Sequence, residues 1–287
     1  MTENSFSLKT WFIAVRPKTL IISVCPVLIG SALAGFESFD LIMFVFILLA
    51  SLFIQIGTNI ANDYYDFIQG ADTKERVGPK RVTQSGLLDS KTVKKGFIYS
   101  FILAFIFGLY PVYKGGPVIL ALGIVSILLG IYYTKGKYSL GYTGVADLFV
   151  LLFFGVFSTG FTYYLHTLEY LPKAFISGLG PGALAVAILC LNNLRDEKED
   201  KKTGKKTLIA RFGPTFGKVE YGLCLTTAFL VLLAYCPLVC WIFALPASFL
   251  HNKLYLSNTS YELIQLLEKT AKLLLFYTLL FIVGSLL

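Results

Sequence analysis

Charged residues are scarce in this sequence, and so is chemistry that depends on histidine. Only 15% of the 287 residues are charged, whereas a soluble globular domain has nearer a quarter. Histidine occurs only as His166 and His251, far apart in the chain, so neither a histidine-based zinc site nor a catalytic triad is expected. The five cysteines form no CxxC pair and all lie in apolar stretches, which favours buried thiols over metal ligands or disulfides.

Long apolar runs are what the sequence has instead. The mean hydropathy is +0.71, and runs of about 20 apolar residues, each long enough to cross a bilayer, recur along the chain. These runs are continuous rather than alternating, which excludes a membrane β-barrel. The predicted fold class is an all-α polytopic membrane protein with about nine transmembrane helices, at 19–36, 41–61, 97–113, 117–134, 144–165, 172–194, 215–235, 237–250 and 270–287.

The segment before the first apolar run has a pattern of its own. Leu8, Trp11, Phe12 and Val15 fall on one face of a helix, which predicts a short helix at the membrane interface. Together with the length of the following apolar run, this pattern argues against a cleaved signal peptide.

Basic residues are distributed very unequally between the two sides of this topology. Of the 25 Lys and Arg residues, all but Lys114 and Lys173 fall on one side. The positive-inside rule makes that side cytoplasmic, so the N-terminus is predicted inside and the C-terminus outside. The net charge of +8 is therefore a topology signal, and no nucleic-acid partner is expected.

Two of the predicted cytoplasmic loops are much richer in polar residues than the others. They are "NDYYDFIQGADTKERVGPKRVTQSGLL", after the second span, and "NNLRDEKEDKKTGKKTLIARFG", after the sixth. Both begin with Asn and Asp at a helix end and continue into Lys, Arg and Gly. This similarity suggests a diverged duplication of a helix-loop unit within a single domain over 1–287, with acidic motifs at 62–72 and 192–200.

The spacing of the acidic motifs points to a metal site. Asn62 and Asp66 are four residues apart, as are Asn192 and Asp196, and Asp196 and Asp200. If the helices continue, each set lines one face. Such oxygen ligands suit Mg²⁺, which proteins hold with a few carboxylates plus substrate phosphates. The alternative is that both segments are solvated juxtamembrane loops, although acids at a helix C-terminus oppose the helix dipole unless a cation is present.

These motifs resemble those of the UbiA-type superfamily of intramembrane aromatic prenyltransferases. The resemblance rests on Asn62–Gly86, Gly141–Gly155 and Asn192–Gly213 and covers nearly the whole chain. Within the superfamily, "ERVGPKRVTQSG" and "GKKTL..RFG" are most similar to the 1,4-dihydroxy-2-naphthoate polyprenyltransferases of menaquinone synthesis. The resemblance implies nine transmembrane helices around a central cavity, a polyprenyl diphosphate donor, an aromatic acceptor, release of CO₂, Mg²⁺ as cofactor, and a bacterial cytoplasmic (inner) membrane.

The resemblance also implies a set of site residues. The metal candidates are Asn62, Asp63, Asp66, Asp72, Asn192, Asp196 and Asp200, with Asn193 nearby. The candidates for binding the diphosphate are Arg76, Lys80, Arg81, Lys205 and Lys206. Asp72 follows Asp66 by six residues, a longer gap than the family pattern has.

The candidate catalytic residues are Asp147, Lys135 and Arg195. Asp147 lies a few residues into the fifth predicted span, where a carboxylate needs either a partner or a role. It could position or deprotonate the acceptor, or pair with Lys135, Lys137 or a loop arginine. The aromatic residues available to stabilise an allylic cation are Tyr64, Tyr65, Tyr132, Tyr133, Phe149, Phe153 and Phe154.

Two alternatives stay open on the sequence alone. The first is a prenyltransferase of the same fold for another acceptor, such as 4-hydroxybenzoate, haem, a chlorophyll-type compound or 1,4-dihydroxy-6-naphthoate, because the loops would bind the diphosphate in every case. The second is a transporter built from repeats. Transporter sites lie near the bilayer midplane, whereas both acidic motifs here are predicted at cytoplasmic helix ends, which disfavours transport.

Overall fold

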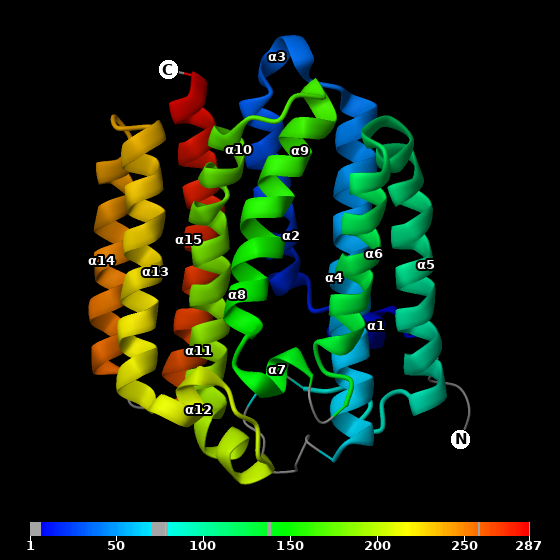
Figure 1. The fold of residues 1–287 in the computed structure, drawn as a ribbon. Coiled ribbons are helices and arrows are strands. Elements are labelled where there is room, and N and C mark those ends of the chain that lie inside the picture. Colours follow the sequence, from blue (N-terminus) through cyan, green and yellow to red (C-terminus); the bar gives the residue numbers. More distant parts are fainter. Residues whose placement is uncertain (1–6, 71–77, 79, 137–138, 258, 287) are drawn as a thin grey trace.

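The computed structural model describes residues 7–70, 78, 80–136, 139–257 and 259–286, and it contains helices but no strand within them (Figure 1). The predicted all-α fold is thus confirmed. The helices are α1 (Leu8–Val15), α2 (Pro17–Leu33), α3 (Gly35–Ser38), α4 (Leu41–Ile68), α5 (Ser90–Gly115), α6 (Pro117–Tyr132), α7 (Leu140–Thr143), α8 (Ala146–Leu151), the π-helix η1 (Leu152–Val156), α9 (Phe157–Thr167), α10 (Pro172–Ser177), α11 (Leu179–Thr203), α12 (Leu208–Phe212), α13 (Pro214–Tyr235), α14 (Cys240–Leu256) and α15 (Ser260–Leu286).

Helices lie in all nine of the predicted ranges and cover most of each, but fewer of them are long and apolar enough to span a membrane. Within the described residues, five helical segments are long and apolar enough to cross a bilayer. The count rises to six if α1 and α2, which meet at 54°, form one bent span. The number of nine crossings therefore stays a prediction. The five segments are Leu41–Ile68, Ser90–Gly115, Ala146–Thr167, Pro172–Thr203 and Pro214–Tyr235.

Local sequence signals explain where the helices begin and end. Asp40 and Asp89 cap α4 and α5, their carboxylates accepting hydrogen bonds from the backbone N–H groups of Met43 and Thr92. Gly204, with φ of 75°, ends α11 in the left-handed conformation that glycine adopts most easily. Each cap satisfies backbone groups that the helix itself leaves unpaired.

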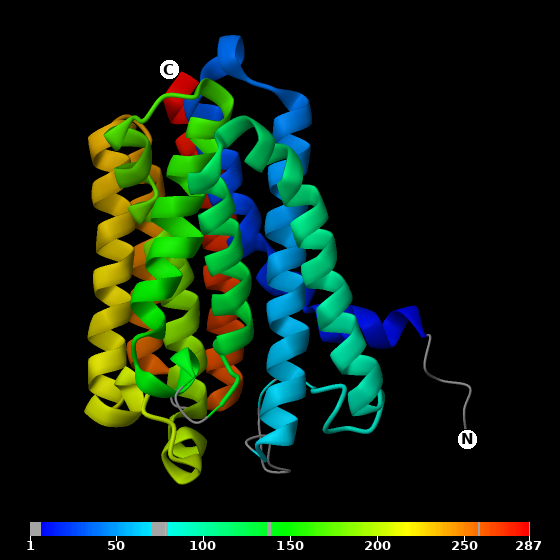
Figure 2. The same ribbon diagram turned by 45° about the vertical axis from the view of Figure 1, so that its right-hand side comes forward.

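The helix α1 runs across the direction of the long helices, beside their lower part (Figure 2). Leu8 and Phe12 are exposed, as an interfacial helix requires. Trp11, on the same predicted face, instead packs over Gly96 of α5, where a Cβ atom would come within 2.6 Å of the indole ring. Part of the predicted apolar face, at Trp11, therefore packs against the protein, and part, at Leu8 and Phe12, is exposed.

The helices form two groups with the acidic motifs at their lower ends (Figures 1 and 2). One group contains α4, α5 and α6, which pack along one another. The other surrounds α11, which packs against α13, α15 and η1, while α15 also packs against α2. The largest side chains of its core, Tyr221, Phe243, Tyr277 and Phe281, are fully buried. The short helix α7 connects the two groups at the lower end in Figure 1.

Candidate active site

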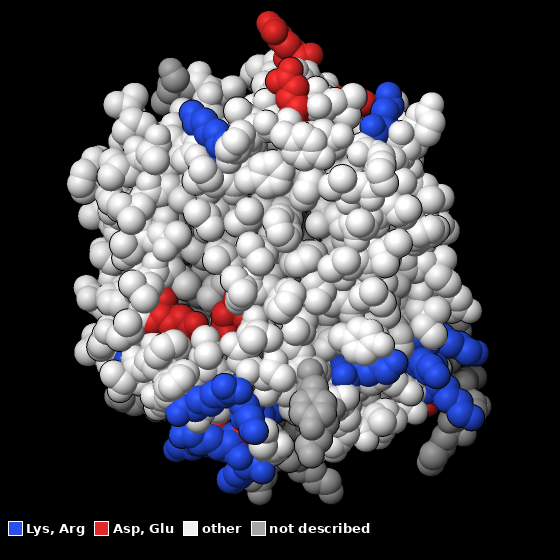
Figure 3. Space-filling view, viewed as in Figure 1, with Lys and Arg blue, Asp and Glu red and all other residues white. Residues whose placement is uncertain are grey.

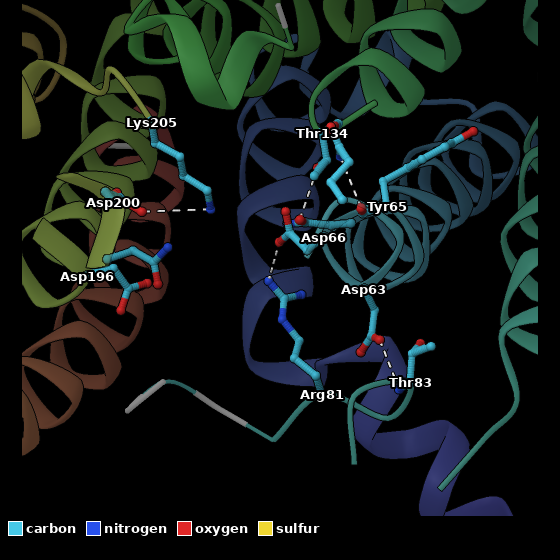
Figure 4. Close-up of polar contacts among 12 residues, drawn as sticks. Asp63, Tyr65, Asp66, Arg81, Thr83, Thr134, Asp196, Asp200 and Lys205 are labelled. Atoms are coloured by element: carbon cyan, nitrogen blue, oxygen red, sulfur yellow. Dashed lines mark hydrogen bonds and ion pairs between the residues drawn. The ribbon is translucent and has the colours of Figure 1, made fainter. Parts of the chain in front are cut away.

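A polar pocket lies where α4 and α11 end. Both helices continue beyond their apolar parts, α4 to Ile68 and α11 to Thr203, and this extension carries the acidic motifs. The two helix ends face each other across the pocket (Figure 4). The residues that line it are Asn62, Asp66, Arg81, Tyr133, Thr134, Gly141, Tyr142, Asn192, Asn193, Asp196, Asp200, Lys205 and Thr207.

The structure thus brings together five of the seven predicted metal ligands: Asn62 and Asp66 from α4, and Asn192, Asp196 and Asp200 from α11. Their spacing of four residues turns each set toward the pocket, because residues i and i+4 share one face of a helix. Their donors are all carboxylate or amide oxygens, the type that Mg²⁺ prefers.

Each pocket carboxylate is held by a cation of the protein itself. Arg81 donates to Asp66 at 2.9 Å, with both side chains about 95% buried. Arg195 Nε donates to Asp196 at 2.7 Å. Lys205 Nζ lies 3.7 Å from Asp200 (Figure 4). These pairs neutralise charges that would otherwise be costly to bury. In the described part of the chain, no three His, Cys, Asp or Glu side chains lie close enough together to be ligands of one metal ion.

Asp63 does not line this pocket, although the sequence predicted it as a metal ligand. Its side chain is 1% exposed, and its two oxygens accept hydrogen bonds from the backbone N–H groups of Val82 at 2.9 Å and Thr83 at 3.1 Å. The carboxylate therefore anchors the loop after α4, which places the neighbouring Arg81 beside Asp66 (Figure 4).

Other predicted residues lie around the pocket rather than in it. Arg195 holds Asn192 and Asp196 through hydrogen bonds of 2.7 Å each. Lys135 is exposed, with its ammonium 5.4 Å from the centre of the Tyr132 ring. Lys80 and Lys206 are exposed. Asp72 and Arg76 lie outside the residues that the structure describes.

The pocket also contains residues that sequence reasoning missed, contributed by the segment between α6 and α8. Thr134 Oγ1 donates to Asn62 at 3.0 Å, and the Tyr142 hydroxyl donates to Asp66 at 3.4 Å. The ammonium of Lys205 lies 4.8 Å from the centre of the Tyr142 ring. The only available signal was the concentration of hydroxyl-bearing residues in "YYTKGKYSLGYTG".

An apolar cavity of about 200 Å³ lies above the polar pocket, between α4, α5, α6 and the α8–α9 segment. Four of the seven predicted aromatic residues line it: Tyr133, Phe149, Phe153 and Phe154. Tyr64 and Tyr65 pack instead against Phe97, with ring centres 5.6 and 5.8 Å away. Tyr132 is half exposed.

The two cavities meet at Tyr133, which lines both of them. On α4 the apolar cavity and the polar pocket are one helical turn apart, because Thr58 lines the cavity and Asn62 lines the pocket. The combined site suits a molecule with an anionic head and a long apolar chain. Aromatic faces at the junction would stabilise a positive charge formed there.

Asp147, predicted as catalytic, lines neither cavity. It lies in the first turn of α8, 9% exposed. Its Oδ1 atom has no hydrogen-bond partner in the part of the chain that the structure describes. Lys137, one of its predicted partners, lies outside the described residues.

An all-helical membrane protein with a polar pocket below an apolar cavity has the architecture that the sequence motifs predicted, that of an intramembrane prenyltransferase. Comparison with known proteins agrees, because the model of the UbiA prenyltransferase family matches residues 23–284. The chain belongs to this family, as its motifs predicted.

The chain is also similar to individual named proteins over nearly the full length of both chains. The chain is 36% identical to 1,4-dihydroxy-2-naphthoate octaprenyltransferase of Haemophilus influenzae, over 97% of this chain and 96% of that protein. It is 33% identical to the protein of the same name from Escherichia coli, over 99% and 97% of the two chains.

Solved structures share the fold. A UbiA homolog from Archaeoglobus fulgidus bound to GPP and Mg²⁺ superposes with a TM-score of 0.65 at 13% identity, over 97% of this chain and all of the other. The apo UbiA homolog from Aeropyrum pernix K1 gives a TM-score of 0.68 at 12% identity, over 93% and 96%. At such low identity the likeness concerns the fold alone.

Proposed function

We propose that the protein transfers a polyprenyl group from polyprenyl diphosphate to 1,4-dihydroxy-2-naphthoate, giving demethylmenaquinol, CO₂ and diphosphate. The observation that carries this proposal is the junction at Tyr133, a residue that lines both the charged pocket and the apolar cavity. The choice of acceptor rests on the relatives that are named for this naphthoate.

The ion pairs of the polar pocket prepare it for a diphosphate. Arg81 and Lys205 form ion pairs with Asp66 and Asp200. The oxygens of an incoming diphosphate would replace the two carboxylates as partners of these cations. Arginine binds phosphate through the same charge-assisted, bidentate hydrogen bonds by which it binds carboxylate, so a diphosphate can replace Asp66 as the partner of Arg81. The pocket oxygens of Asn62, Asp66, Asn192, Asp196 and Asp200 would then hold Mg²⁺, which supplies further stabilisation of charge on the leaving diphosphate.

Transfer follows from this arrangement. The bond between the allylic carbon and the diphosphate oxygen breaks, and its electron pair stays on the oxygen, next to cations already in place. Positive charge on the allylic carbon develops beside Tyr133 and the phenylalanine-lined cavity, whose faces stabilise it without attacking it. The acceptor ring supplies the electrons of the new C–C bond. The bond from the ring to its carboxylate then breaks, its electrons return to the ring, and CO₂ leaves.

We further propose nine membrane crossings by one intramembrane domain, with the N-terminus in the cytoplasm of a bacterial cell and the C-terminus outside. Support comes from the basic side chains that gather at the lower rim, below a broad band that shows no Lys or Arg on the face drawn in Figure 3. The positive-inside rule favours a cytoplasmic position for such a rim. The α1 helix and the end of α15 lie at opposite ends of the bundle (Figure 1), as an odd number of crossings requires.

Another aromatic acceptor is the main alternative, since the polar pocket would serve any prenyl diphosphate. The test is an assay of the protein in membranes with Mg²⁺, a polyprenyl diphosphate, and either 1,4-dihydroxy-2-naphthoate or 4-hydroxybenzoate, with the products identified by mass spectrometry. We expect a prenylated naphthalene that has lost its carboxylate, and no product when Mg²⁺ is chelated. A higher kcat/KM for 4-hydroxybenzoate, or diphosphate release without any acceptor, would refute the proposal.

A further inference from the structure

Four phenylalanines form a continuous row along one wall of the apolar cavity. They are Phe149 of α8, Phe153 of η1, and Phe157 and Phe161 of α9, and all four line the cavity. The centres of neighbouring rings lie 6.3, 5.3 and 6.1 Å apart along the row. The four rings therefore make one extended aromatic surface, which we call the phenylalanine row.

The π-helix η1 explains how residues at a spacing of four stay on one wall. In an α-helix, four residues cover one turn and about 40° more, so three such steps would turn the row by about 120°, away from the cavity. A π-helix, with its i→i+5 hydrogen bonds, has more residues per turn, so the same step turns the row less. Because η1 spans Leu152–Val156, in the middle of the row, it offsets part of the rotation.

The lower end of the phenylalanine row adjoins the polar pocket. The helix α7 comes directly before α8 and contributes Gly141 and Tyr142 to the pocket. The backbone N–H of Gly141 also donates to the carbonyl of Tyr133 at 2.9 Å, and Tyr133 lines both cavities. A donor whose diphosphate lies in the pocket would therefore direct its prenyl chain upward past Phe149.

The upper end of the cavity is closed by Ile119 of α6 and Leu165 of α9. Both are buried, and both would lie within 2.7 Å of a Cβ atom placed at Gly115, so they pack against the same point. The two helices run in opposite directions (Figure 1). Phe161 lies one turn below Leu165, and Gly123 lies one turn below Ile119 on the opposite wall, so the two residues are at the same height.

The length of the phenylalanine row matches about four isoprene units. Phe161 follows Phe149 by twelve residues, which is about 18 Å at about 1.5 Å per residue. An isoprene unit adds four chain bonds of about 1.5 Å each, or about 5 Å in a zigzag. The ring spacings of 5.3 to 6.3 Å are close to that length, so successive rings lie about one unit apart.

We propose that the phenylalanine row binds the prenyl chain of the donor with about one isoprene unit against each ring, and that it makes affinity depend on chain length up to four units. This inference rests on the proposed function, because it takes a polyprenyl diphosphate as the occupant. Phe149 contacts the first unit, at the reacting carbon, and Phe161 contacts the fourth. Each further unit buries apolar surface against a ring and strengthens binding.

The test measures donor affinity in detergent without an acceptor, from the shift in thermal unfolding that each donor causes in the presence of Mg²⁺. The donors are geranyl, farnesyl and geranylgeranyl diphosphate, with two, three and four units. Phe157→Ala should raise the Kd about tenfold for the three-unit and four-unit donors, and by less than about twofold for the two-unit donor. Phe161→Ala should raise the Kd for the four-unit donor alone.

Two further variants separate contact with the chain from support of the helix. No other described atom lies within 4 Å of a Cβ atom placed at Gly123, so Gly123→Leu fills the cavity opposite Phe161 and should also weaken the four-unit donor alone. Phe249→Ala removes the same side chain from an exposed position on α14 and should leave all three Kd values unchanged. A purely structural role of the row would lower the unfolding temperature without changing the ratios between donors.

Equal weakening of all three donors by Phe157→Ala and Phe161→Ala would overturn the proposal, and so would Kd values that neither variant changes. Failure of the proposed function gives another result. A parent protein that binds the donors with the expected dependence on length, but transfers none of them to an aromatic acceptor, would refute the proposed function and leave the phenylalanine row in place. A parent that binds none of the three donors would refute both.

Discussion

Among single residues, the partner of each carboxylate decides what that carboxylate does. Asp63 and Asp66 belong to the same short motif, yet Asp66 lines the polar pocket while Asp63 binds loop backbone. The helix explains the difference, because Asp66 shares a face with Asn62 whereas Asp63 points about 100° away from it. Asp63 therefore acts on the site indirectly, by holding the loop that carries Arg81.

The substitution Asp63→Asn tests this structural role. An amide can accept from only one of the two backbone N–H groups of Val82 and Thr83, which leaves the other buried without a partner. We expect the free energy of unfolding to fall by about 1–3 kcal/mol, with kcat reduced less than tenfold. Thermal unfolding in detergent measures the first and the transfer assay the second. A fully stable but inactive variant would instead favour a direct metal role for Asp63.

A second residue pair offers a matched comparison for diphosphate binding. Lys205 lines the polar pocket near Asp200, whereas the adjacent Lys206 is exposed outside it. Lys205→Ala should raise the donor KM about tenfold, by the loss of one charge-assisted contact, and equally for short and long prenyl chains. Lys206→Ala should leave the KM nearly unchanged. If Lys205→Ala raised the KM only for long donors, this loop would contact the prenyl chain rather than the diphosphate.

Sequence periodicity predicted which residues of the acidic motifs share a face, because local geometry fixes that relation. It could not predict the loop that Asp63 holds, which lies about 20 residues further on, or the hydroxyls of Thr134 and Tyr142 in the pocket. Each of these contacts depends on how separate helices pack, which no local pattern records.

Among whole helices, the apolar runs predicted positions well and lengths poorly. The second and sixth spans were predicted to end at 61 and 194, whereas α4 continues to Ile68 and α11 to Thr203. The polar residues beyond each apolar run still form helix, and these extra turns carry the site. The change to a π-helix at η1 leaves no hydropathy signal, because apolar residues flank it on both sides. The break between α1 and α2 was predicted, because Arg16 and Lys18 separate the interfacial helix from the first apolar run.

Close contact between η1 and α11 holds the wall of the apolar cavity in place. A Cβ atom at Gly155 would lie 2.4 Å from the carbonyl oxygen of Gly178 and 2.5 Å from Cα of Gly182. Both are backbone atoms and cannot move aside. Glycines at such positions let membrane helices approach closely.

The substitution Gly155→Val should therefore push η1 and α11 apart. We expect the free energy of unfolding to fall by about 2–3 kcal/mol, as overpacking of a tight contact does. Gly123→Val on α6 is the matched control, because nothing lies within 4 Å of a Cβ atom there, and its stability should stay close to that of the parent. Thermal unfolding of both variants in the same detergent makes the comparison. Equal stability of the two would contradict the contact.

For the molecule as a whole, a band without Lys or Arg on the face drawn separates a basic rim from the opposite end (Figure 3). We expect a membrane-impermeant thiol reagent, added to intact cells, to label Glu169→Cys and not Lys91→Cys; both positions are exposed. The five native cysteines are buried and should give little background. Labelling of Lys91→Cys from outside would reverse the orientation and remove the polar pocket from the cytoplasmic side.

The central claim is that this chain prenylates a dihydroxynaphthoate, the precursor of a naphthoquinone, at the junction of its two cavities. The most direct test is mass spectrometry of the quinones in a bacterium that lacks its own naphthoate prenyltransferase, carrying either the parent or Asp196→Asn. This variant keeps an oxygen for Arg195 but loses a carboxylate of the pocket. We predict menaquinone with the parent and none with the variant, although both are present in the membrane. No naphthoquinone with the parent, or equal amounts with both, would contradict the account.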